Sequence, residues 1–190
     1  MGIDIRSIFQ KKHDGHWTDV LSDYDNDRDY LLYRWLYHGG SDADGSCAIE
    51  PIRPQRGLPA DFEVVDDYWH PLRGEGGNPT LGPLRLMGEW GHSWLLAEEI
   101  LDTPAPRVTR TASIPIDEYR AWDGQSEPPW QWICNGWGHA VGAPDKITEQ
   151  ADVVVLEWNY DFTEDFRYFV DEVRRLKDLH GELRFIFGFA

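Results

Sequence analysis

TEDFRYFVDEVRRLKDLHGELRFIFGF, residues 163–189, is the stretch of the chain that decides the fold most clearly. Thr163 can cap a helix and Gly181 can end it. Between them, apolar residues recur at helical spacing and predict one buried helix face: Phe166, Phe169, Val170, Val173 and Leu176. Apolar residues then recur at every second position from Leu183 to Phe189, which predicts a closing strand with one apolar face.

A buried strand is expected before this helix, because residues 153–156 (VVVL) form a short continuous apolar run. A strand, a helix and a strand in succession typically form a parallel or next-but-one pair, joined by a right-handed crossover. We therefore expect residues 153–156 and 183–189 to belong to one sheet.

The beginning of the chain predicts a hairpin. Residues 3–9 form the first strand, His13-Asp14-Gly15 is a turn signal, and residues 16–20 form the partner strand. Residues 3–9 and 183–189 are both short alternating segments flanked by turn signals. We expect these two segments to lie in one central sheet.

Further elements follow from capping residues and periodicity. A helix is expected over residues 28–37, capped by Asn26 or Asp27 and stopped by Gly39-Gly40. Ser93 is expected to cap a helix that runs to Leu101, with His92 and Ser93 at its start. The remaining expected elements are a short helix near residues 61–68, a strand over 108–116 and a helical turn over 116–122.

Two long segments rich in Gly, Pro or Trp, residues 41–93 and 123–144, separate these elements. Long loops in a compact domain usually indicate function or mobility. The predicted fold class is α+β: a single domain over residues 1–190, with a mixed or antiparallel sheet and flanking helices.

Composition restricts the class of protein. The 190 residues include 34 acids and 18 bases, a net charge of −16, which disfavours direct binding to nucleic acid. The two cysteines are too few for a disulfide framework or a cysteine zinc site. The sequence contains no apolar run of about 18 residues, so we expect no membrane span. We expect a cytoplasmic protein without a cofactor. The acids suit a solvated surface, a DNA-mimicking decoy, a high-salt host or a basic protein partner.

The candidate ligand-binding residues lie on two segments. Arg53 and Arg56 lie on a proline-stiffened loop, and arginine is the residue that grips phosphate or carboxylate with two hydrogen bonds. The alternative for both is internal ion pairing. His92, Ser93 and Trp94 would lie beside the free backbone N–H groups of a helix start, which suits an anion. The alternative there is a serine cap with a core tryptophan.

Asp4 and Arg6 point to the same face of the first strand, where they can pair with each other. The alternative is that Asp4 has a metal-binding or catalytic role, with a partner such as His92. The histidines show no metal-ligand spacing, so no metal site is predicted. Cys134 has only His139 nearby in sequence as a base, and Gly136-Trp137-Gly138 lacks the context of a phosphate loop. No strong catalytic signature is present, and the catalytic residues stay unknown.

The opening Met1-Gly2-Ile3-Asp4-Ile5-Arg6 resembles the Met-Gly-Cys-Asp-Ile-His start of an uncharacterised protein family of bacteriophages and bacterial genomes. Ile3 and Arg6 depart from that motif, and Arg6 can act neither as a metal ligand nor as a base. Further similar segments follow in order along nearly the whole chain: 28–33, 56–59 (RGLP), 91–95 (GHSWL), 108–110, 118–119, 122–124 and 184–187. The closing Phe187-Gly188-Phe189-Ala190 differs from the family's Phe-Trp-Phe-Asp-Asn. The resemblance implies a phage or prophage context and no particular chemistry.

Three functions from different classes are compatible with these residues. The leading hypothesis is a phage accessory protein that binds a nucleotide-like or phosphorylated ligand, and so sequesters a host defence signal. In it, Arg56 and His92 face a shared concave site with an exposed Trp or Tyr. The second is a hydrolase that uses Asp4 and His92, with or without a divalent metal. The third is an acidic inhibitor of a host protein, with DNA mimicry as its strongest form.

Overall fold

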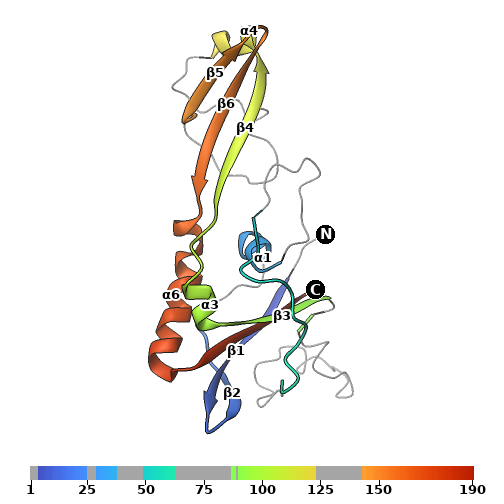
Figure 1. Ribbon diagram of the computed structural model, residues 1–190, viewed down its shortest axis with the longest axis vertical. Helices are drawn as coiled ribbons and strands as arrows, with labels where there is room; N and C mark the ends of the chain where they lie inside the picture. Colours follow the sequence, from blue (N-terminus) through green and yellow to red (C-terminus); the bar gives the residue numbers. More distant parts are fainter. Residues whose placement is uncertain (1–3, 25–28, 38–48, 63–86, 89, 123–142) are drawn as a thin grey trace. The chain divides into compact units, whose positions relative to one another are not determined.

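The computed structural model describes residues 4–24, 29–37, 49–62, 87–88, 90–122 and 143–190. The chain is α+β, as predicted, with helices and two antiparallel sheets (Figure 1). It divides into two compact units. Met1–Tyr37, Glu50–Pro104 and Thr163–Ala190 form the first unit, and His38–Ile49 with Ala105–Phe162 form the second. The single domain over residues 1–190 stays a prediction.

The sheet of the first unit has the strand order β2-β1-β7-β3, and all its pairings are antiparallel. Its strands are β1 (Ile5–His13), β2 (His16–Val20), β3 (Trp90–Leu96) and β7 (Leu183–Phe189). β1 pairs with β7 from Ile5 opposite Phe189 to Lys11 opposite Leu183. The two ends of the described chain therefore lie in one sheet, which confirms the expectation for these segments, and they are direct neighbours in it.

The hairpin between β1 and β2 closes as the sequence predicted. His13 pairs with His16, so Asp14 and Gly15 are the two turn residues. Their φ angles are 49° and 82°, and this left-handed conformation at both positions is typical of a type I′ turn. Such a turn suits the right-handed twist of the flanking strands.

Three helices belong to the described part of the first unit: α1 (Tyr30–Leu36), α3 (Ala97–Leu101) and α6 (Thr163–His180). The cap of α1 is Asp29, whose carboxylate accepts hydrogen bonds from the backbone of Leu31 and Leu32, so the expected caps Asn26 and Asp27 are wrong. α6 ends as predicted, with Gly181 in the left-handed conformation after its last residue, and Thr163 is its first residue. The expected end of α1 at Gly39-Gly40 and residues 63–68 of the expected short helix lie outside the described residues.

The apolar face expected for β7 is buried, and the opposite face, which carries Arg184, Ile186 and Gly188, is buried as well. One face is packed against helices, because Phe169 of α6 lies 5.2 Å from Phe185 and Tyr33 of α1 lies 4.8 Å from Phe189 between ring centroids. On the other face, Ile186 belongs to a cluster of apolar residues. Ile8, Phe62 and Met87 are its other buried members, with Leu58 and Trp94 packed against them.

The second unit contains a three-stranded sheet with the order β4-β6-β5 and one short helix, α4 (Ile116–Ala121). The strands are β4 (Arg107–Pro115), β5 (Lys146–Gln150) and β6 (Val153–Asp161). β4 and α4 confirm the strand and the helical turn that the sequence predicted. The core of this sheet consists of Ile114, Val154, Leu156 and Trp158.

The expected crossover between residues 153–156 and 183–189 is wrong, because β6 and β7 belong to different sheets. The physical reason is that both hydrogen-bonding edges of β7 are occupied, one by β1 and the other by β3. β6 is likewise paired on both edges, by β4 and β5. A strand can pair on two edges only, so neither is available to the other.

Gly188 lies at a place where the chain crosses closely over the sheet. A Cβ atom at this position would collide with the carbonyl oxygen of Met87 and lie 2.8 Å from Cδ2 of His92. The segment that crosses here is equally close, since a Cβ atom on Gly88 would lie 2.6 Å from the carbonyl carbon of Phe189. Glycine at both positions therefore lets backbone pack directly on backbone.

We predict that Gly188→Ala lowers the free energy of unfolding by about 3 kcal/mol, the upper end of the cost of overpacking, because the obstacle is backbone. Gly57→Asn is the matched control. Gly57 has a φ of +72° with no atom within 4 Å of an added Cβ, and asparagine tolerates that conformation. Urea denaturation measures both variants. Equal stability of Gly188→Ala and the wild type would contradict the described crossing.

Candidate functional site

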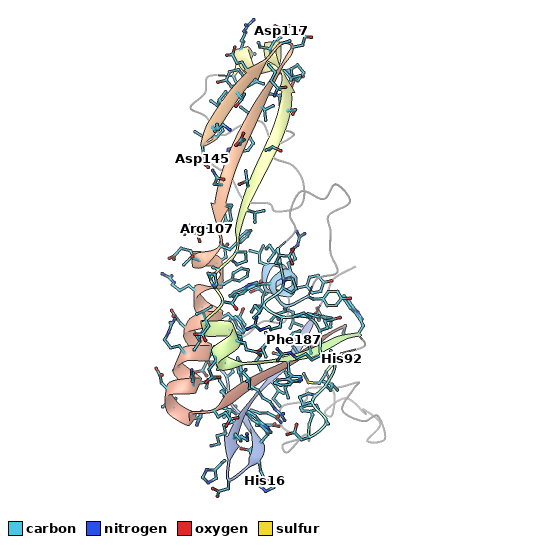
Figure 2. The ribbon with its side chains drawn as sticks, viewed as in Figure 1. His16, His92, Arg107, Asp117, Asp145 and Phe187 are labelled. Atoms are coloured by element: carbon cyan, nitrogen blue, oxygen red, sulfur yellow. The ribbon has the colours of Figure 1, made fainter. Side chains whose placement is uncertain are left out.

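His92 and Ser93 lie in the interior of strand β3, so their expected position at a helix start is wrong. Trp94 and Leu95 pair with Ile186 and Phe185 of β7, and this pairing outweighs the local helix signal. The helix α3 begins only at Ala97. Figure 2 labels His92 on β3 and Phe187 on β7, the strand beside it.

Two arginines converge on one carboxylate at the end of β3. Arg56 donates from Nη1 to Oε2 of Glu99 at 2.8 Å and from Nη2 to Oε1 at 2.6 Å. Arg53 donates from Nε to Oε1 of the same residue at 3.1 Å. Arg56, Arg53, Glu99 and Trp94 are called the Arg–Glu cluster below. The two-point contact of Arg56 is the geometry in which guanidinium binds carboxylate and phosphate most strongly.

The position of Arg56 is fixed at its backbone and at its side chain. Its backbone N donates to Oγ of the buried Ser93 at 3.1 Å. Its guanidinium carbon lies 4.9 Å from the ring centroid of Trp94, within the range of a cation–π contact. Ser93 is thus a support for the arginine loop and not a helix cap.

The pKa of the Glu99 carboxyl group lies well below the usual value for a glutamate. The hydrogen bonds from Arg56 lower the pKa of Glu99 to about 2, against the opposing effect of burial, with further help from the backbone N of Leu96 and from Arg53. That backbone N donates to Oε2 at 3.0 Å. Arg53 and Arg56 therefore form internal ion pairs with Glu99, which was the alternative to ligand binding that the sequence allowed for both arginines.

Asp4, Arg6 and His92 lie on one face of the first unit's sheet. Arg6 pairs across the strands with Gly188, and the ring of His92 lies close to the same glycine. Arg6 Nη2 lies 3.6 Å from Asp4 Oδ2, which confirms that this acid and base pair with each other. Nε2 of His92 lies 3.1 Å from the carbonyl oxygen of Gly88. The structure therefore places Arg6 and His92 at Gly188, with Asp4 joined to Arg6.

A buried polar network on the same face was not predicted. Arg184 is only 3% exposed, and it donates from Nε and Nη2 to Oε1 of the fully buried Gln10 at 2.9 and 2.7 Å. Its Nη1 donates to Asp61 Oδ1 at 2.7 Å and so lowers the pKa of Asp61. Its guanidinium carbon lies 4.3 Å from the centroid of the Trp17 ring.

The network continues from Gln10 to β2. Nε2 of Gln10 donates to Asp19 Oδ1 at 2.7 Å, while the buried Oδ2 has no hydrogen-bond partner among the described residues. The only sequence signal for the network is that Gln10 and Arg184 interrupt apolar strands at positions that pair with each other. The sequence alone does not give the strand register, so this pairing could not be predicted from it.

No group of three potential metal-binding side chains occurs within the described part of the chain, and no helix there is long and apolar enough to cross a membrane. Cys134, His139 and the loop around them lie outside the described residues. Comparison with protein-family models, with curated proteins and with solved structures found no match.

We predict that Arg184→Ala destabilises the protein, because the buried Gln10 oxygen would lose the two hydrogen bonds that Arg184 donates. An unsatisfied buried acceptor alone costs about 1–3 kcal/mol, and the lost packing on Trp17 adds to it. The control is Arg174→Ala in α6, which removes an exposed ion pair with Asp171 and should cost less than about 1 kcal/mol. Urea denaturation of both variants decides; equal effects would show that the network contributes no more than a surface pair.

Proposed function

We propose that the protein binds an anionic, nucleotide-like or phosphorylated small molecule at Arg53 and Arg56. The observation that carries the proposal is the convergence of two guanidiniums on the two oxygens of one carboxylate, beside an aromatic ring. This arrangement already binds an anionic group of the protein itself. The same donors fit two oxygens of a phosphate.

Charge supports an external anion here. Two guanidiniums against one carboxylate leave a positive charge in excess, in a chain whose net charge is −16. The site is also accessible, since the side chains of Arg53 and Arg56 are 49% and 29% exposed. Trp94 adds a planar surface at the same place, which favours a ligand that combines a phosphate with an aromatic base.

The biological setting of the proposal comes from the resemblance to a phage and prophage family. A phage accessory protein that binds a nucleotide-like signal would act in the host cytoplasm by lowering the free concentration of that signal. Such sequestration needs binding alone and no catalytic group.

A hydrolase is the second candidate, and one observation favours it. Asp4 and His92, the two residues of this hypothesis, belong to the same sheet: Asp4 exchanges backbone hydrogen bonds with Ala190, and the ring of His92 lies beside Gly188. Asp4, however, already pairs with Arg6, whose Nη2 lies 3.6 Å from Asp4 Oδ2.

An acidic inhibitor of a host protein is less favoured, because acids of α6 are matched with arginines one turn away. Glu164 pairs with Arg167, and Asp171 pairs with Arg174. A mimic of DNA needs carboxylates that no neighbouring base neutralises.

We predict that Arg56→Ala abolishes binding of nucleotides while leaving the ligand-free protein nearly as stable as the wild type. Solvent screens this pair, whose side chains are 29% and 17% exposed, and Arg53 stays on Glu99, so the loss should cost only about 1–2 kcal/mol, whereas a two-point contact with phosphate would be lost entirely. A thermal-shift screen with nucleoside triphosphates, cyclic nucleotides and pyrophosphate measures both effects, because a ligand of the native state raises the melting temperature.

Arg174→Ala is the control in this screen, since it removes an arginine of equal charge from an exposed pair elsewhere in the first unit. It should respond to ligands as the wild type does. If no compound shifts the wild type, and Arg56→Ala unfolds markedly earlier, Arg56 is structural and the proposed function is wrong.

A further inference from the structure

The side chain of Glu99 occupies the place in the Arg–Glu cluster that a phosphate would take. We propose that Glu99 is a built-in competitor of the ligand, which sets the affinity of the site and selects ligands with a dianionic phosphate. The inference rests on the proposed function and adds the ligand class and the residue that determines affinity.

Glu99 occupies the outer edge of the Arg56 guanidinium, the one formed by its two terminal nitrogens. Both terminal nitrogens of Arg56 are directed at Glu99, one to each carboxylate oxygen, at 2.8 and 2.6 Å. A guanidinium has five N–H groups, and the two that point at Glu99 cannot donate fully to a second anion at the same time. A ligand that takes this same edge of Arg56, between Nη1 and Nη2, must therefore displace the Glu99 carboxylate.

Glu99 has a second partner that remains after such a displacement. The backbone N of Leu96 donates to Oε2 at 3.0 Å. The carboxylate can therefore keep this hydrogen bond while it releases Arg56. Displacement costs the ion pair alone and leaves the start of α3 satisfied.

The competition determines which ligands succeed. A ligand with one negative charge exchanges one monoanion for another and gains little. A terminal phosphate carries about two negative charges at neutral pH and pyrophosphate carries more, so either can balance both Arg53 and Arg56. The expected ligand class is therefore a phosphate monoester or a diphosphate, in preference to a phosphodiester such as a cyclic nucleotide.

The test is calorimetric titration of pyrophosphate into the wild type, Glu99→Gln and Glu98→Gln. Glu99→Gln removes the competing charge and keeps an amide oxygen that can accept from Leu96. Glu98→Gln is the matched control, because it removes the same charge one residue away, from a pair with Lys177 at 3.0 Å. We expect Glu99→Gln to bind pyrophosphate about tenfold more tightly than Glu98→Gln does.

Binding by the wild type without a gain in Glu99→Gln over Glu98→Gln would overturn the inference and leave the proposed function standing. Glu99 would then merely orient the arginines. Absence of binding by all three proteins, with pyrophosphate and with ATP, would overturn both.

A measurement on the wild type alone tests the ligand class independently of any variant's folding. Pyrophosphate and ATP should bind at least about tenfold more tightly than cyclic AMP. Equal or tighter binding of cyclic AMP would contradict the selection of dianionic phosphates.

Discussion

Strand β7 is the constraint on which the rest of the first unit depends. It pairs along both edges, with β1 and with β3, and each of its residues from Leu183 to Phe189 is buried. The side chains of such a strand must pack on both faces of the sheet. Phe185 and Phe189 pack against α6 and α1, and Arg184, Ile186 and Gly188 lie on the opposite face.

That opposite face explains why polar and small residues occur in such a strand. Gly188 lets the backbone of Met87 cross closely, and Arg184 is buried with its hydrogen bonds to Gln10 and Asp61. A buried charge without such partners would be very unfavourable. The same face carries Arg6 and the ring of His92, so the candidate chemistry gathers on the face opposite the one that packs against α1 and α6.

The position of the candidate arginines follows from the core. Residues 50–62 form no regular helix or strand, yet Ile52 and Phe62 are buried at either end of the segment. The backbone N of Ile52 also donates to the carbonyl oxygen of Trp35 in α1. Arg53 and Arg56 are therefore presented by a segment that buried residues hold at both ends, and Glu99 meets them from α3.

Local signals predicted much of this fold, and the errors have a common cause. The β1–β2 turn, α6 and the alternation of β7 depend on neighbouring residues, and the sequence predicted all three. The helix expected at Ser93 failed because pairing of β3 with β7 involves residues almost a hundred positions apart.

The same limit applies to the candidate site and to the smaller elements. Arg53, Arg56 and Trp94 were predicted, whereas Glu99 was not, because its distance from the arginines depends on how α3 follows β3. β5 was missed because its sequence, KITEQ, contains one apolar residue and is largely exposed.

The central claim is that the two arginines hold the carboxylate of Glu99 in an anion-binding arrangement. The most direct measurement is the pH titration of the Glu99 side-chain carboxyl carbon by nuclear magnetic resonance. Ordinary glutamates titrate at about pH 4.3. The structure predicts that the chemical shift of Glu99 stays at the value of the ionised carboxylate through that range, because the pKa of Glu99 is about 2. A midpoint at the ordinary value while the protein remains folded would show that the arginines do not hold Glu99, and would contradict the account.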